Sequence, residues 1–179
     1  MKGFTLIEMM MVLSIAAILL TVAVPSYNTF SQNSKITKQV NLLAASVSAA
    51  RGEAAKRGGR VVMCQSDSPT ASNPECGGSS ASGTWTNGWI VFVDADGNGD
   101  RDTSVGPPIP EPVVGAFQTE NGVIIKTTAG ETLSFNPDGT TTGGAVEYYV
   151  CDTRGVNYGK QLDIAGTGRP STDDATSCG

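Results

Sequence analysis

The N-terminal residues constrain the fold of this chain most, because they combine a long apolar run with one internal charge. Phe4 to Val24 is a run of 21 residues in which Glu8 is the only charged side chain. A helix of that length reaches about 30 Å, enough to cross the hydrocarbon core of a bilayer. A carboxylate inside such a segment costs about 2.5–3.5 kcal/mol on insertion scales. We therefore predict a membrane-spanning helix whose one acid has a partner and a function.

The segment at residues 3–8 carries a family resemblance. Its sequence, GFTLIE, places Gly3, Phe4 and Glu8 in register with the apolar run. It resembles the N-terminal signature of type IV pilins and of the pseudopilins of type II secretion. The resemblance implies a prepilin leader, residues 1–3, that prepilin peptidase cuts between Gly3 and Phe4 before Phe4 is N-methylated. It also implies that Glu8 pairs during assembly with the N-terminal amine of a neighbouring subunit, so that each buried charge offsets the other's desolvation.

An ordinary signal peptide is the alternative for this segment. It would have a longer basic region, no acid in the apolar run, and often a small-residue cleavage site after that run. The sequence has only Lys2 before Gly3, and Glu8 interrupts the run. We therefore favour the pilin interpretation.

The helix is expected to continue well past the apolar run. Pro25 should kink it without ending it, because helix-compatible residues resume at once. Apolar residues then recur at spacings of four and three, which predicts one buried stripe of an amphipathic helix: Ile36, Val40, Leu43, Val47, Ala50 and Ala54. Gly58 and Gly59 should end the helix. We expect a helix over 4–57, with 4–24 in the membrane or filament core and 25–57 amphipathic.

Composition and charge limit what the remaining chain can do. There is no histidine, which removes Ser–His–Asp and Cys–His sites and the commonest zinc ligand. We therefore expect no enzymatic activity. The net charge is −5, and from Val61 onward five basic residues face fifteen acidic ones. We interpret a basic stretch over residues 35–60 as a solvated helix face, and a face toward anionic lipid or an acidic neighbour is the alternative. The overall field does not attract nucleic acid, so any DNA contact would be local.

Residues 58–179 are predicted to form a β-rich globular head, which gives an α+β fold of the type IV pilin kind. Short β-favouring runs separated by turn residues indicate an antiparallel head, with two small sheets packed on the helix. The expected strands are 60–64, 89–93, 123–127, 131–135, 145–151 and 160–165. Residues 105–112 contain four prolines and are expected to form an extended connector.

Four cysteines indicate two disulfides if the head lies in an oxidising compartment. Three pairings are possible. We favour Cys64–Cys76 and Cys151–Cys178, because each would close a loop rich in small and polar residues. The spacing does not match a paired C-x-x-C zinc site.

Several segments of the head resemble the GspH/FimT (FimU-like) group of minor pilins and pseudopilins. They are residues 51–58, 62–64, 88–94, 135–139 and 168–169, in the expected order. The resemblance implies a minor pilin of the type IV pilus that helps initiate or prime filament assembly. It also implies one pass through the bacterial inner membrane, a periplasmic head, and contacts with other pilins, prepilin peptidase and the inner-membrane assembly platform. A type II secretion pseudopilin and a DNA-uptake receptor for natural transformation are the alternatives.

An acidic segment is the candidate metal site. Asp94, Asp96, Asn98, Asp100 and Asp102 fall in a segment whose first, third and fifth positions match a calcium loop, with Gly99 at the sixth. The twelfth position is Val105, so the bidentate glutamate is missing. We therefore expect a turn in which Asp and Asn cap their own backbone, and no cofactor. A weak calcium site is the alternative.

Gly168 and Arg169 form the candidate DNA site. In FimT-like DNA receptors the C-terminal segment resembles Gly-Arg-x-Arg, but Ser171 replaces the second arginine here and two aspartates follow. Losing one cation and adding two carboxylates weakens a phosphate site. We therefore favour a polar turn inside the Cys151–Cys178 loop over DNA binding through Arg169.

Overall fold

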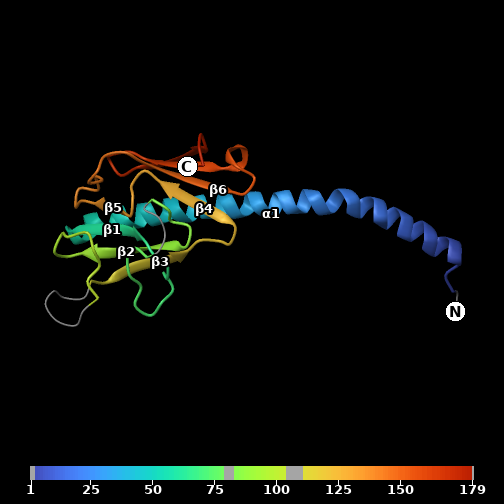
Figure 1. The fold of residues 1–179 in the computed structure, drawn as a ribbon, viewed down its shortest axis with the longest axis horizontal. Helices are drawn as coiled ribbons and strands as arrows, with labels where there is room; N and C mark the ends of the chain where they lie inside the picture. Colours follow the sequence, from blue (N-terminus) through green and yellow to red (C-terminus); the bar gives the residue numbers. More distant parts are fainter. Residues whose placement is uncertain (1–2, 79–82, 104–110, 179) are drawn as a thin grey trace. The chain divides into compact units, whose positions relative to one another are not determined.

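The structure is a computed structural model that describes residues 3–78, 83–103 and 111–178. The chain forms two compact units, Met1–Ser34 and Lys35–Gly179. Helix α1 (Leu6–Arg57) contributes to both units, and the eight strands all belong to the second (Figure 1). The prediction of a long N-terminal helix followed by a β-rich head is confirmed.

Helix α1 ends where the glycines predicted it would. Gly58 adopts a φ of 63°, and the Gly59 N–H donates to the Ala54 carbonyl at 3.3 Å. These two features are a Schellman cap, which needs a residue with positive φ. Just before the cap, Glu53 accepts from Arg57 at 2.7 Å and from Lys56 at 3.3 Å. The hydrogen bonds from Arg57 and then Lys56 lower the pKa of Glu53 below its ordinary value.

The head contains two antiparallel sheets, as predicted, and each has four strands. The first sheet has the order β3-β2-β1-β5, and the second has the order β4-β6-β7-β8. The bounds are β1 (Arg60–Gln65), β2 (Gly88–Asp94), β3 (Val113–Gln118), β4 (Val123–Thr127), β5 (Thr132–Phe135), β6 (Val146–Asp152), β7 (Lys160–Ile164) and β8 (Pro170–Asp174).

Two of these strands were not predicted. Strand β3 contains Gly115, which breaks the alternating pattern, and a register shift between Val91 and Phe92 interrupts its pairing with β2. Strand β8 lies in the segment predicted to be a polar turn, and four of its five residues are exposed. Both are terminal strands of their sheets. An edge strand pairs on one side only and needs less apolar sequence, which explains why the pattern missed them.

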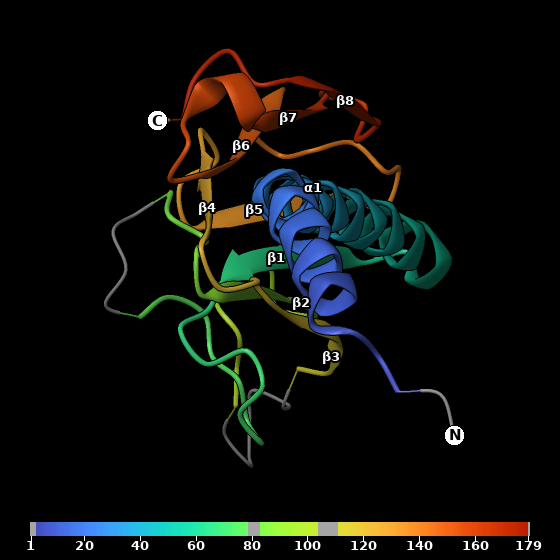
Figure 2. The same cartoon turned by 90° about the vertical axis from the view of Figure 1, so that its right-hand side faces the viewer.

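The core of the second unit is built around the predicted helical stripe. All six stripe residues are at most 2% exposed: Ile36, Val40, Leu43, Val47, Ala50 and Ala54. From Lys35 onward α1 lies between the two sheets, with β1–β3 on one side and β6–β8 on the other (Figure 2). Trp85 packs edge-on against Tyr148, with ring centroids 5.1 Å apart. The stripe is therefore ordinary core packing shared by both sheets.

Both favoured disulfides are present. Cys64 pairs with Cys76 and Cys151 pairs with Cys178, with Cα–Cα distances of 5.5 and 5.9 Å. Cys64 also belongs to a second, smaller apolar cluster on the outer face of the first sheet, where Val62, Ile90 and Phe92 are fully buried. The loop that Cys76 anchors covers this cluster.

Gly159 is required by close packing at the second disulfide. A Cβ at this position would lie 2.7 Å from the Cys151 Sγ and 2.9 Å from the Ala175 Cβ. We expect Gly159→Ala to lower the free energy of unfolding of the head by about 1–3 kcal/mol, because the added methyl overpacks the site. Urea denaturation measures this change.

Gly143→Ala is the matched control, because nothing lies within 4 Å of its Cβ position and its φ is not positive. Its effect should stay within about 0.5 kcal/mol. Equal stability of the two variants would contradict the packing argument.

Candidate functional site

The N-terminal segment places Glu8 in the first turn of α1. The Glu8 N–H donates to the Thr5 Oγ1 at 3.3 Å, and the Thr5 N–H donates to the Glu8 Oε2 at 3.5 Å. This reciprocal pair is a capping box, with Thr5 as N-cap and Glu8 three residues later. A carboxylate here also lies in the positive field of the helix N-terminus. The structure thus gives Glu8 a local role that the sequence interpretation missed, although the T-x-x-E spacing was visible.

Gly3 and Phe4 precede the helix in non-helical backbone. Phe4 is 79% exposed, and nothing lies within 4 Å of a Cβ built on Gly3. The Gly3–Phe4 bond is therefore sterically open to a protease. Cleavage there and methylation of Phe4 stay predictions.

The apolar part of α1 has the length and composition of a membrane-spanning helix. None of its most apolar stretch is buried inside the protein. Pro25 lies within the helix and does not end it, as predicted. Threonine hydroxyls on either side bond to backbone carbonyls: Thr21 donates to Ile18 at 2.7 Å, and Thr29 donates to Pro25 at 3.2 Å. Such bonds keep polar side chains satisfied in an apolar segment. The kink itself stays a prediction.

The acidic loop after β2 is a network of backbone caps. The Asp94 carboxylate accepts from the Gly97 N–H at 2.7 Å and from the Gly99 N–H at 3.1 Å. Asp96 accepts from the Asn98 N–H at 3.0 Å, and Asn98 accepts from the Asp100 N–H at 2.6 Å. These are the contacts that the turn interpretation predicts.

Glu111 is the residue of this loop that the sequence interpretation missed. It is 2% exposed and accepts from the Ala95 N–H at 2.6 Å and the Asp102 N–H at 3.1 Å. One oxygen each from Asp94, Asp96 and Glu111 lie within 4.8 Å of one another, whereas Asp100 and Asp102 do not join this group. In the sequence, the signal for Glu111 is an acid between two prolines, just before strand β3, which was not predicted. Val105 lies outside the described residues, and the calcium alternative stays a prediction.

Asp94 should stabilise the head without any metal. Asp94→Ala removes the acceptor of two backbone N–H groups and the partner of Arg60, whose Nε lies 3.5 Å away. We expect a loss of about 2 kcal/mol in the free energy of unfolding in EDTA, because those donors lose a buried charged acceptor. The matched control is Asp100→Ala, an exposed residue whose side chain makes no hydrogen bond within the described part of the chain. If Asp94→Ala destabilises only when calcium is present, the turn interpretation is wrong.

The calcium alternative has a separate test. Binding would raise the melting temperature in millimolar Ca²⁺, since a ligand that binds the native state stabilises it, and Asp96→Ala would abolish the rise. An unchanged transition contradicts a calcium site.

Three segments of the GspH/FimT resemblance meet beside the helix. The Arg51 Nε donates to the Gly139 carbonyl at 3.2 Å. Gly168 adopts a φ of 74°, and a Cβ built on it would lie 2.2 Å from the same carbonyl. The turn between β7 and β8 therefore lies against the turn that follows β5, and only glycine fits at their contact.

Arg169 follows this contact and is exposed. Within the described residues its side chain makes no hydrogen bond or ion pair, and its carbonyl accepts from the Ala165 N–H at 3.0 Å. Asp173 and Asp174 of the adjacent strand are exposed as well, and Asp174 pairs with Lys160. Arg169 thus lies just before the start of β8, and the two acids lie at the far end of that strand. DNA binding through Arg169 stays a prediction.

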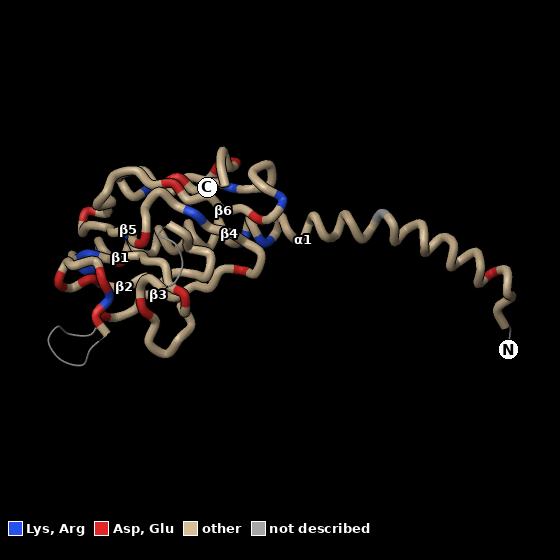
Figure 3. Tube along the Cα trace, in the orientation of Figure 1, with Lys and Arg blue, Asp and Glu red and all other residues tan. Residues whose placement is uncertain are grey.

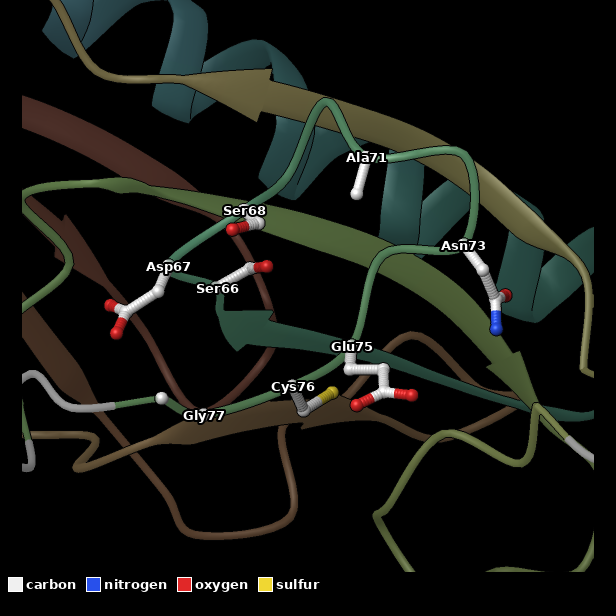
Figure 4. A pocket seen from close by; sticks show the side chains of 9 residues that line it. Ser66, Asp67, Ser68, Ala71, Asn73, Glu75, Cys76 and Gly77 are labelled. Atoms are coloured by element: carbon white, nitrogen blue, oxygen red, sulfur yellow. The ribbon is translucent and has the colours of Figure 1, made fainter.

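The Cys64–Cys76 loop encloses a shallow polar pocket of about 300 Å³ (Figure 4). Ser66, Ser68 and Glu75 are among its lining residues. Asp67 points away from the interior and accepts from the Asn87 Nδ2 at 2.8 Å. The pocket follows from the disulfide, which folds the loop back over the first sheet.

An apolar N-terminal helix followed by two antiparallel sheets packed on its amphipathic half is the architecture of a type IV pilin-like filament subunit. The family model described as Type II transport protein GspH matches residues 39–168, and the prokaryotic N-terminal methylation motif matches residues 1–24. The chain belongs to the GspH family of minor pilins and pseudopilins. Membership implies a membrane-anchored subunit that assembles with other pilins and is processed by prepilin peptidase.

Solved structures share this fold. The type IV minor pilin FimU of Pseudomonas aeruginosa matches in two crystal forms, each at 18% identity over 99% of its own chain. One form covers 84% of this chain with a TM-score of 0.57, and the other covers 80% with a TM-score of 0.53. The minor pseudopilin EpsH from the type 2 secretion system of Vibrio cholerae matches at 8% identity over 78% of this chain and 97% of its own, with a TM-score of 0.49. Among curated proteins, none matches the sequence.

Proposed function

We propose that this chain is a minor pilin of a type IV pilus that helps to initiate filament assembly. The observation that carries the proposal is Glu8, the one charge in a 21-residue apolar run. A residue that costs about 2.5–3.5 kcal/mol in a bilayer needs a compensating function there. The N-terminal methylation motif and the GspH match over the head occur in the same chain, and together they support a filament subunit.

The proposed sequence of events begins in the inner membrane. Prepilin peptidase removes residues 1–3 and methylates Phe4, whose exposed, non-helical position gives the enzyme access. Glu8 is then the fifth residue of the mature chain, four residues from the new N-terminal ammonium group. In the bilayer its carboxylate stays bonded to Thr5. On assembly it pairs with the amine of a neighbouring subunit, which offsets the desolvation of both charges.

Two variants separate the local role of Glu8 from its role in assembly. Glu8→Gln keeps the capping box, because glutamine also serves at that position, but it removes the charge. Thr5→Ala removes the cap and keeps the charge. We expect Glu8→Gln to lower incorporation into filaments by roughly tenfold or more, and Thr5→Ala to have a small effect. Immunoblots of sheared filaments and of membrane fractions measure incorporation against total subunit.

The reverse pattern would show that Glu8 acts only as a helix cap. Normal incorporation of Glu8→Gln together with loss for Thr5→Ala would therefore contradict charge pairing. Membrane levels of both variants must match the unsubstituted chain for the comparison to hold.

A deletion strain tests which filament the subunit serves. The proposal expects loss of surface pili, restored by the intact gene. Loss of type II secretion with normal pili would instead assign the chain to a pseudopilus. Loss of transformation in cells that still build pili would assign it to DNA uptake, and Arg169→Ala would then reproduce the defect.

A further inference from the structure

The exposed large hydrophobic side chains of the second unit are concentrated on one turn. Among the described residues of Lys35–Gly179, only Val156 and Tyr158 are of this kind, 36% and 46% exposed. Both belong to the short 3₁₀ helix η1 (Val156–Tyr158), which has no buried residue. The other large apolar side chains that the structure describes in this unit are buried or half-buried. An apolar turn on an otherwise polar surface indicates a contact that the isolated subunit does not make.

The turn is held by an ion pair and a cation–π contact. Asp152 accepts from Arg154 through both Nε, at 2.9 Å, and Nη2, at 2.7 Å. The Arg154 guanidinium also lies 4.3 Å from the centre of the Tyr158 ring. Burial would raise the pKa of Asp152, but the Arg154 hydrogen bonds and charge outweigh it and lower that pKa below the ordinary value. Gly159, which ends the turn, packs on the Cys151 sulfur. The two side chains are therefore presented without a large loss of conformational entropy on contact.

The turn lies at the end of the second unit where the helix enters. Lys35 donates to the Asn121 carbonyl at 3.4 Å, and Lys38 pairs with Glu120. The turn that contains these two acceptors leads into β4, whose first residue, Val123, is paired with Asp152. Figure 3 shows basic and acidic residues together at this end. Lys35 follows Val24, the last residue of the apolar run, by eleven residues, so the chain itself tethers this end near the bilayer.

The size of the contact decides which partner fits. A stable protein interface buries about 1,200–2,000 Å² in total. Two partly exposed side chains offer a small part of that area, since one aromatic side chain buries about 150–250 Å². A surface that is tethered close to its partner needs to bury far less area, because a short linker gives an effective concentration in the millimolar range. Tyrosine with nearby lysine and arginine is also the composition favoured at membrane–water interfaces.

We propose that Val156 and Tyr158 rest in the headgroup region of the bilayer while the subunit waits in the membrane, with Lys35 and Lys38 beside anionic lipid. The contact orients the head before assembly and is broken when the subunit enters a filament. This inference rests on the proposed function in one respect, the insertion of residues 4–24 in a bilayer.

Tryptophan reporters in the full chain test the contact. Tyr158→Trp is placed in vesicles that contain anionic lipids brominated near the headgroup, which quench nearby tryptophan emission. The native Trp85 and Trp89 are fully buried and give a constant background, measured on the unsubstituted chain. Thr167→Trp is the matched control, because Thr167 is exposed on the β7–β8 turn, beyond the Ile164–Val146 end of the sheet. Leu13→Trp, 68% exposed near the middle of the apolar run, reports insertion in parallel vesicles whose lipids are brominated along the acyl chains.

We expect quenching of Leu13→Trp and of Tyr158→Trp, the latter about twofold or more above Thr167→Trp. Val156→Trp should behave like Tyr158→Trp and serves as the second reporter if that variant lowers the melting temperature.

Quenching of Leu13→Trp with equal signals from residues 158 and 167 would overturn the contact and leave the proposed function intact. No quenching of Leu13→Trp would contradict both. A change in the tryptophan emission of Tyr158→Trp that appears only when other pilins are added would also overturn the lipid contact, because the partner would then be a protein.

Discussion

The fold of the head depends on one apolar stripe of α1 that two sheets must share. The inner face of each sheet is apolar, and neither sheet can bury that face without a second layer. The helix supplies that layer to both, so its six stripe residues are almost fully removed from water. The stripe ends in Ala50 and Ala54, whose small side chains let β-strands approach the helix near its cap.

The helix and its end could be predicted because their signals are local. The apolar run, the spacing of four and three, and the Gly58–Gly59 cap each depend on residues close in sequence. The favoured disulfide pairing was also confirmed, and its signal was the composition of each closed loop, which is rich in small and polar residues. The N-terminal motif identified the family for the same reason. Its residues are neighbours, and their spacing is visible without a structure.

The missed features depend on contacts between distant segments. Strands β3 and β8 are held by one neighbour each, so their own sequences carry little strand signal. Glu111 is buried because it caps a loop that begins seventeen residues earlier, at Asp94. Gly168 is a glycine because of the Gly139 carbonyl, which lies in another hairpin. No local sequence pattern shows which distant segment a residue contacts. The exposed apolar turn η1 could not be predicted for the same reason.

The order of the strands has a mechanical consequence. Strand β4 lies between β3 and β5 in the chain, yet it belongs to the second sheet while they belong to the first. The polypeptide therefore crosses from one layer to the other and back, around the helix. Neither sheet can separate from the helix by itself, because the segments that connect β3, β4 and β5 join the two sheets. When force acts along the helix of a subunit in a filament, we expect the head to unfold in a single cooperative transition.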